Sequence, residues 1–149
     1  MKKVKKGLKG KNPTKGNFTY LNHIVELCQT KCSAKNLEEF TSLDNLEESL
    51  AVRAAYWCNN IIPVLGKKKG SEKKQINDIY GQDLLKLSKM HMLYLAFKIT
   101  RDTIEGESYK DPKVKQLLSL CLRIWALNQL SKDSHDLYEC GYFSAGAGN

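Results

Sequence analysis

The residues best suited to chemistry in this sequence are five cysteines and three histidines. Cys28 and Cys32 stand four positions apart, so on a helix their thiolates would lie one turn from each other and could share a metal ion. Further ligands are missing, because His23, His91 and His135 are scattered and no CxxC or HxxxH pair occurs. We therefore expect no metal site.

Nucleophilic catalysis would need a serine or cysteine held beside a base and a third orienting group. The nearest pattern is Ser134-His135-Asp136, three consecutive residues whose side chains should point in different directions on a helix. His91 falls inside a long helical pattern and is expected to be an ordinary polar residue, partly buried or at the surface. We assign no catalytic, cofactor-binding or metal-ligating residue to the chain.

Positive charge is the most unusual feature of the composition, with a formal net charge of +8 over 149 residues. Half of the 24 lysine and arginine residues fall in two runs, within residues 1–16 and 67–74. Neither run follows a predicted strand or has the spacing of a phosphate-binding loop. Residues 1–16, rich in Lys and Gly, are predicted to be a basic flexible linker. The alternative is a stand-alone basic helical module that binds an acidic partner such as nucleic acid.

The cysteines and the apolar stretches also bear on the cellular compartment. An odd number of cysteines with no secretory leader ahead of them predicts a reducing compartment, where most thiols pack as small hydrophobic groups. No apolar stretch reaches the roughly 18 residues needed to cross a bilayer. We expect neither a signal peptide nor a transmembrane segment.

In the first half of the chain, apolar spacing predicts two helices. One runs from Phe18 to about Cys32, and residues 33–41 connect it to the next. The second begins at an N-cap, Asp44, with Glu47 three residues later, and is ended by Pro63 with Gly66. Its apolar stripe contains Trp57, which we expect to be substantially buried.

The second half of the chain predicts two further long helices and a short one. The first extends from about Asp83 to Ile104. The second starts at Asp111-Pro112, an acidic cap followed by proline, and carries a wide apolar face that includes Cys121 and Trp125. A short amphipathic segment, 137–143, follows. Because no alternating strand pattern occurs, we predict an all-α antiparallel bundle over residues 17–149.

Five segments of these helices follow the motifs of one protein family, in the same order. Residues 41–55 (TSLDNLEESLAVRAA) are similar to a "Ser-Leu-x-x-Leu … Arg-Ala-Ala" helix, and residues 87–94 (LSKMHMLY) to an "Ala-x-x-His-x-x-Tyr" helix. Residues 111–121 (DPKVKQLLSLC) match a "Val-Leu-x-x-Leu-Cys" helix, and residues 125–127 (WAL) stand in place of "Tyr-Ala-Leu". Residues 132–144 (KDSHDLYECGYFS) resemble "Asn-Ala-Gly-Asp-Phe-Leu-x-x-Gly-Tyr-Leu-Ser". Together these segments resemble the C-terminal region of peroxisomal acyl-CoA oxidases.

The resemblance implies a FAD-dependent oxidase that converts acyl-CoA to trans-2-enoyl-CoA and releases hydrogen peroxide in peroxisomal fatty acid β-oxidation. It also implies that the chain is a fragment or truncated relative, with residues 17–149 as an incomplete C-terminal-like domain. The expected partners are the remainder of an oxidase or a dimer partner, and the family's substrate is acyl-CoA.

Several family features are missing from this sequence. Neither the "Phe-Glu-Gly" stretch that holds the family's catalytic glutamate nor its "Arg-Tyr-Asp-Gly" motif occurs. The chain alone is therefore predicted to be inactive and to bind no FAD. It ends in Gly148-Asn149 and not in a Ser-Lys-Leu-type tripeptide, so the peroxisomal location follows from the resemblance alone and the cytoplasm stays an alternative.

Overall fold

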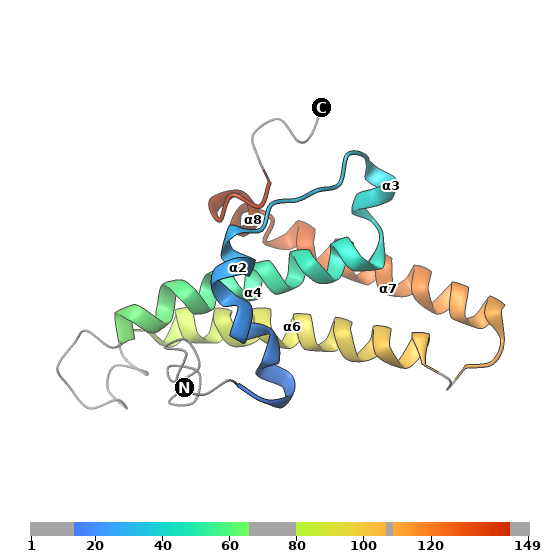
Figure 1. The fold of residues 1–149 in the computed structure, drawn as a ribbon, viewed down its shortest axis with the longest axis horizontal. Helices are drawn as coiled ribbons and strands as arrows, with labels where there is room; N and C mark the ends of the chain where they lie inside the picture. Colours follow the sequence, from blue (N-terminus) through green and yellow to red (C-terminus); the bar gives the residue numbers. More distant parts are fainter. Residues whose placement is uncertain (1–13, 66–79, 107–108, 144–149) are drawn as a thin grey trace.

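The computed structural model of the chain describes residues 14–65, 80–106 and 109–143. All regular structure in these ranges is helical, which confirms the predicted all-α class. Three long helices, α4, α6 and α7, run alongside one another with alternating direction, and short elements cover one side of α4 (Figure 1). The elements in chain order are η1 (Gly16–His23), α2 (Ile24–Gln29), α3 (Leu37–Phe40), α4 (Leu43–Leu65), α6 (Gly81–Glu105), α7 (Pro112–Lys132) and α8 (His135–Glu139).

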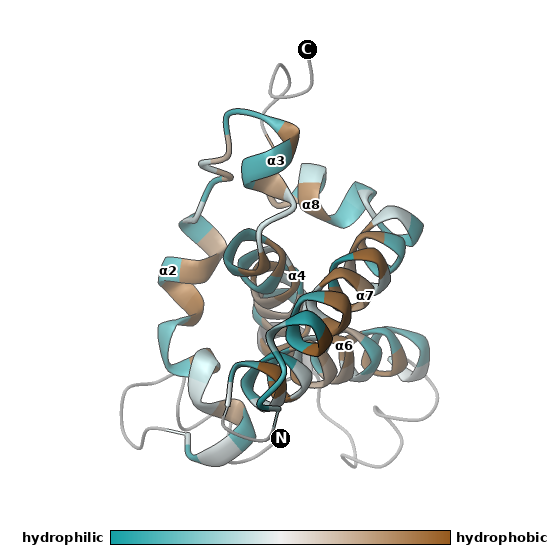
Figure 2. Cartoon of the chain, turned by 90° about the vertical axis from the view of Figure 1, so that its right-hand side faces the viewer, coloured by the Kyte–Doolittle hydropathy of each residue, from teal (hydrophilic) through white to brown (hydrophobic). Residues whose placement is uncertain are grey.

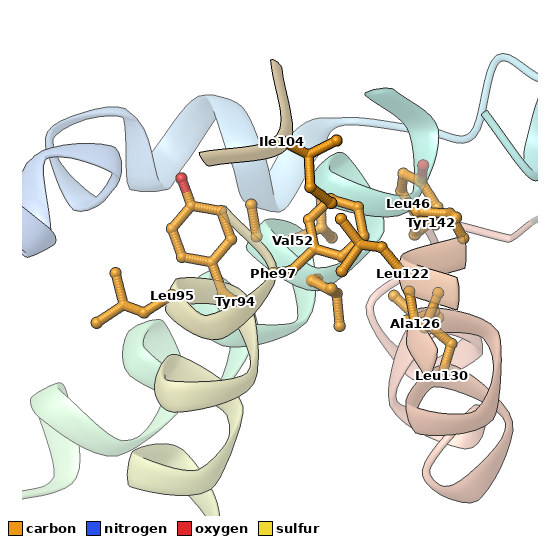
Figure 3. Close-up of a cluster of buried hydrophobic side chains, with 13 residues drawn as sticks. Leu46, Val52, Tyr94, Leu95, Phe97, Ile104, Leu122, Ala126, Leu130 and Tyr142 are labelled. Atoms are coloured by element: carbon orange, nitrogen blue, oxygen red, sulfur yellow. The ribbon is translucent and has the colours of Figure 1, made fainter. Parts of the chain in front are cut away.

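The core lies where α4, α6 and α7 meet. Phe97 of α6 is completely buried, close to Val52 of α4 and Leu122 of α7 (Figure 3). The α7 helix adds Ala126 and Leu130 on the same side, one turn apart, as an i, i+4 spacing requires. Helix α4 is therefore the central element, since it contacts α2, α3, α6, α7 and α8.

The N-terminal segment differs from the single helix predicted over residues 18–32. A 3₁₀ helix, η1, leads into α2, which ends at Gln29. The chain then becomes extended, and the backbone N–H of Cys32 donates to the carbonyl of Tyr142 at 2.9 Å. Helix α2 ends before Cys32 because the N–H of Cys32 bonds to the C-terminal turn and is not available for a helical hydrogen bond. The spacing of apolar residues within the segment cannot reveal such a distant contact.

The start of α4 also corrects the prediction. The cap is Ser42, whose hydroxyl accepts a hydrogen bond from the backbone N–H of Asn45 at 3.3 Å. Asp44 and Glu47 lie within the helix and form ion pairs with Arg101 of α6, at 2.6 and 3.0 Å. A short helix, α3, occupies part of the predicted connection. At its other end α4 runs through Pro63 and ends at Leu65, directly before Gly66, the second of the two residues predicted to end it.

The later helices agree more closely with the predictions. Helix α7 begins at Pro112 after Asp111, whose carboxylate accepts a hydrogen bond from the N–H of Lys113 at 2.8 Å. Helix α6 covers the predicted range with a few residues added at its start, and α8 occupies part of the predicted 137–143 segment. Within the described residues no helix is both long and apolar enough to span a membrane.

Burial corrects one detail of the predicted core. Both tryptophans are mostly buried, in agreement with their place on the apolar stripes, and Trp125 packs against the main hydrophobic cluster. Cys121, placed on the buried stripe of α7 by its spacing, is exposed. The apolar face of α7 is wider than the surface that α4 and α6 cover, so one half of it is left outside.

Candidate functional site

The most distinctive chemical feature is a buried polar cluster that joins α4, α6 and α8. At its centre is Asp136 of α8, which is completely buried. Its carboxylate accepts hydrogen bonds from the indole N–H of Trp57 at 2.9 Å and from the ammonium of Lys86 at 3.0 Å. The Lys86 ammonium also lies 4.2 Å from the centre of the Trp57 ring, a cation–π contact. A single carboxylate therefore ties three helices together.

A second charged residue, Arg53 of α4, is also completely buried. One of its terminal nitrogens donates to the backbone carbonyl of Gln129 in α7 at 3.1 Å. Nε and the other terminal nitrogen find no acceptor among the described residues. Burial lowers the pKa of the Arg53 guanidinium, while the negative charges of Asp133 and Asp136 act in the opposite direction. Arginine keeps its proton in proteins, so Arg53 contributes a fixed positive charge.

The rim of the cluster consists of exposed or half-exposed charges. Lys89 lies 3.1 Å from Asp133. Burial opposes ionisation of Asp133, but the hydrogen bond from Lys89 and the nearby positive charges outweigh it and lower its pKa. His135 approaches Asp136 at 3.1 Å, although adjacent side chains on a helix usually point in different directions. Ser134 makes no hydrogen bond to His135 in the described structure, so the consecutive triple is not a catalytic triad.

The C-terminal turn is fixed to α4 by a neighbouring set of contacts. Gly141 has a positive φ of 73°, which a glycine adopts without strain and which turns the chain back after α8. The hydroxyl of the buried Tyr142 then donates to Glu48 at 2.9 Å and accepts from Ser49 at 3.3 Å. Burial raises the pKa of the Tyr142 hydroxyl, which therefore stays protonated and keeps its hydrogen for Glu48.

An open depression of about 370 Å³ lies between the N-terminal segment and helices α4 and α6. Its charged groups are largely paired with one another, since Arg101 bridges Asp44 and Glu47. Beyond it, the hydroxyl of Tyr20 lies 2.8 Å from Nδ1 of His91, on which Phe18 stacks at 4.4 Å. The depression is lined by Tyr20, His23, Leu27, Asp44, Glu47, Glu48, Ala51, Tyr94 and Arg101.

The structure does not bring the other sequence candidates together into a site. Among the described residues, no group of three or more histidine, cysteine or carboxylate side chains could hold a metal ion. His23 pairs with Glu26 at 2.7 Å, and His91 lies far along the chain from it, against Tyr20. Both glycine-bordered lysine runs fall outside the described residues, apart from residues 14–16.

The groups present suit packing better than acid–base catalysis or flavin binding. A pyrophosphate is bound by donors and positive charge, whereas the depression presents three carboxylates, from Asp44, Glu47 and Glu48. It is therefore a poor fit for FAD, and we derive no chemical step through that group. Whether this chain alone binds FAD stays a prediction.

Sequence reasoning missed the residues that build the polar cluster. In the sequence Asp136 stands out only as part of the Ser134-His135-Asp136 triple, and no pattern singles out Lys86. One signal was present: Arg53 interrupts a run of small apolar residues (AVRAA) in the middle of a helix, where a charged side chain must be paired or exposed.

A comparison with protein-family models identifies one family. The family model described as acyl-CoA oxidase matches residues 42–148. The fold is similar to that of Arabidopsis thaliana acyl-CoA oxidase 1, with a TM-score of 0.85 and 18% sequence identity. That similarity covers 97% of this chain and 22% of the Arabidopsis chain, so the chain spans about a fifth of that protein's length. No curated protein sequence matches the chain.

Proposed function

The chain belongs to the acyl-CoA oxidase family, and we propose that it supplies the helical part of such an oxidase and packs against a flavin-containing portion or a dimer partner. The complete enzyme would oxidise acyl-CoA to trans-2-enoyl-CoA with FAD and release hydrogen peroxide, in fatty acid β-oxidation in the peroxisome. The role of this chain in that assembly is structural. It would be inactive when alone.

The observation that carries this proposal is the amount of apolar surface on the outer faces of α6 and α7. On α6, the side chains of Leu85, Met92 and Ile99 are 54–66% exposed. On α7, large apolar side chains are exposed at four positions, between 40% and 61%. Contiguous exposed apolar patches typically mark sites where another protein surface packs. A helical portion of a larger enzyme would have such surfaces.

The buried polar cluster supports the same structural role. Asp136 and Arg53 fix α8 and α7 to α4 through hydrogen bonds at 2.9–3.1 Å. Such contacts hold helix positions, and with them the outer faces, in one arrangement. The cluster contains no serine or cysteine hydrogen-bonded to a base within the described residues. We therefore give it a positioning role and no chemical step.

The test is to co-express the chain with the flavin-containing portion of an acyl-CoA oxidase encoded in the same genome. We expect the two to co-purify, and the complex to carry flavin and to form hydrogen peroxide from acyl-CoA. The chain purified alone should do neither. A chain that stays apart from the oxidase portion, and binds RNA or heparin tightly with a steep dependence on salt, would contradict the proposal and favour the nucleic-acid alternative.

A further inference from the structure

Helix α7 carries a row of exposed apolar side chains with coiled-coil spacing. Positions 114, 117, 121 and 124 follow one another at intervals of three, four and three residues, the spacing of a seam that packs against another helix. Ile124 is 60% exposed and Leu117 is 61% exposed. We call this surface the α7 seam; it comprises Val114, Leu117, Leu120, Cys121 and Ile124.

The α7 seam is separate from the side of α7 that faces the core. The buried residues of α7 are Leu122, Ala126 and Leu130. With 3.6 residues per turn, Leu117 and Ile124 fall on the opposite side of the helix from these three. Much of the α7 ribbon is accordingly coloured as apolar in Figure 2. The helix therefore has two apolar faces, one packed and one open.

The charges of α7 are all positive. Its sequence is PKVKQLLSLCLRIWALNQLSK, which contains three lysines, one arginine and no aspartate or glutamate. Lys113, Arg123 and Lys132 are exposed, and none of them forms an ion pair within the described ranges. With 3.6 residues per turn, Lys113 and Lys132 lie on the side of the α7 seam, whereas Arg123 lies nearer the core side. Lys115 donates to the carbonyl of Gly106 at 3.0 Å. By contrast, the open face of α6 is bordered by both signs, with Lys98 paired to Asp102 at 3.3 Å.

From the spacing and the charge, we infer that the α7 seam binds an amphipathic helix whose apolar residues are flanked by aspartate and glutamate. The spacing selects a helix and not a strand, because knobs at intervals of three and four fit only a helical surface. A second copy of α7 is disfavoured, since it would bring a second set of positive charges to a surface that already carries Lys113 and Lys132. The inference rests on the proposed function in one respect: the bound helix is taken to belong to the oxidase assembly.

A direct test uses the full chain and two synthetic helices of about three heptads each, with leucine at the a and d positions. One probe has glutamate at the e and g positions, and the other has lysine there. Fluorescence anisotropy should show the glutamate helix binding at least about tenfold more tightly than the lysine helix. Raising the salt concentration should reduce that difference.

The variant Ile124→Glu should weaken binding of the glutamate helix by at least about tenfold, and Leu117→Glu should do the same. Met92→Glu is the matched control, because Met92 on α6 has the same 60% exposure and should leave binding unchanged. Circular dichroism checks that each variant folds. Equal affinity for both probes, or equal loss in the Met92 and Ile124 variants, would overturn the inference.

Analytical ultracentrifugation tests whether a second copy of the chain covers the α7 seam. A wild-type dimer that Ile124→Glu converts to a monomer would show that a second copy covers the α7 seam, which would also overturn the inference. The assay contains no oxidase portion, so its failure leaves the co-purification test of the proposed function intact.

Discussion

Helices α4 and α7 are of similar length, 23 and 21 residues, yet they are buried to very different extents. Nine of the thirteen residues from Leu46 to Cys58 of α4 are buried, and one of the nine is the charged residue Arg53. On α7 only Leu122, Ala126 and Leu130 are buried, while apolar side chains of the same size as leucine, such as Ile124, lie exposed. Among the described residues, the central helix α4 contacts α2, α3, α6, α7 and α8, whereas α7 packs mainly against α4 and α6.

The difference shows which side chains are covered by other described parts of the chain and which are not. Arg53 and Asp136 can be buried because other helices provide hydrogen bonds and opposite charge. The apolar residues of the α7 seam have no comparable cover, although their transfer from water would be favourable. The interior of the bundle is therefore paired largely within the chain, although Nε and one terminal nitrogen of Arg53 have no acceptor among the described residues. Our proposal assigns the outer side of α7 to an oxidase partner.

The largest effect should come from the core side of this comparison. Phe97→Ala removes a completely buried ring between α4, α6 and α7, and should lower the free energy of unfolding by about 3–5 kcal/mol. Urea denaturation followed by circular dichroism measures this. Ile99→Ala, two residues away but 54% exposed, should change it by less than about 0.5 kcal/mol. Similar losses in both variants would contradict the description of Phe97 as buried in the core and of Ile99 as exposed.

The polar cluster should give the next largest effect. Asp136→Asn keeps the size of the side chain but removes the negative charge that accepts from Lys86 and faces Arg53. We expect a loss of about 1–3 kcal/mol in the free energy of unfolding, measured by thermal unfolding. The control is Asp133→Asn at the more exposed rim of the cluster, which should cost less. If Asp136→Asn is neutral, Asp136 does not fix α8 to the bundle.

The sequence could predict helices but not this cluster. The start of α7 was predictable because Asp111-Pro112 acts locally, within one turn. The hydrogen bond from Trp57 to Asp136 joins residues 79 positions apart, so it depends on how α8 packs. For the same reason the early end of α2 at Gln29 escaped prediction. The spacing of α7 indicated a wide apolar face but could not tell which half would be covered.

A smaller effect should appear with pH at the N-terminal segment. Burial lowers the pKa of His91, so the folded chain holds this proton less strongly than the unfolded chain. The burial of neutral His91 therefore adds fully to the free energy of unfolding above about pH 6.5, the ordinary pKa of histidine. This stability is lost as the pH falls from that value towards the lower pKa of His91 in the folded chain. Urea midpoints at about pH 7.5 and pH 5 should differ more in the wild type than in His91→Gln. An equal difference in both proteins would assign the dependence to other groups.

The smallest effect on stability is expected at the α7 seam itself. Ile124→Glu replaces a 60% exposed side chain, and should change the free energy of unfolding of the isolated chain by less than about 0.5 kcal/mol. Chemical denaturation of the monomeric chain checks this. A loss as large as that of Phe97→Ala would show that Ile124 belongs to the core, and would remove the distinction between the two faces of α7.

The central claim, that the outer side of α7 packs against an oxidase partner, is tested most directly by alkylation of Cys121. This thiol is exposed in the middle of the α7 seam, whereas Cys58 is buried and its raised pKa, about 12, makes it unreactive. The rate of maleimide labelling at Cys121, located by mass spectrometry, is measured for the chain alone and for the chain co-purified with the flavin-containing portion. We predict rapid labelling alone and at least about tenfold slower labelling in the complex. Equal rates in the two samples would contradict the claim.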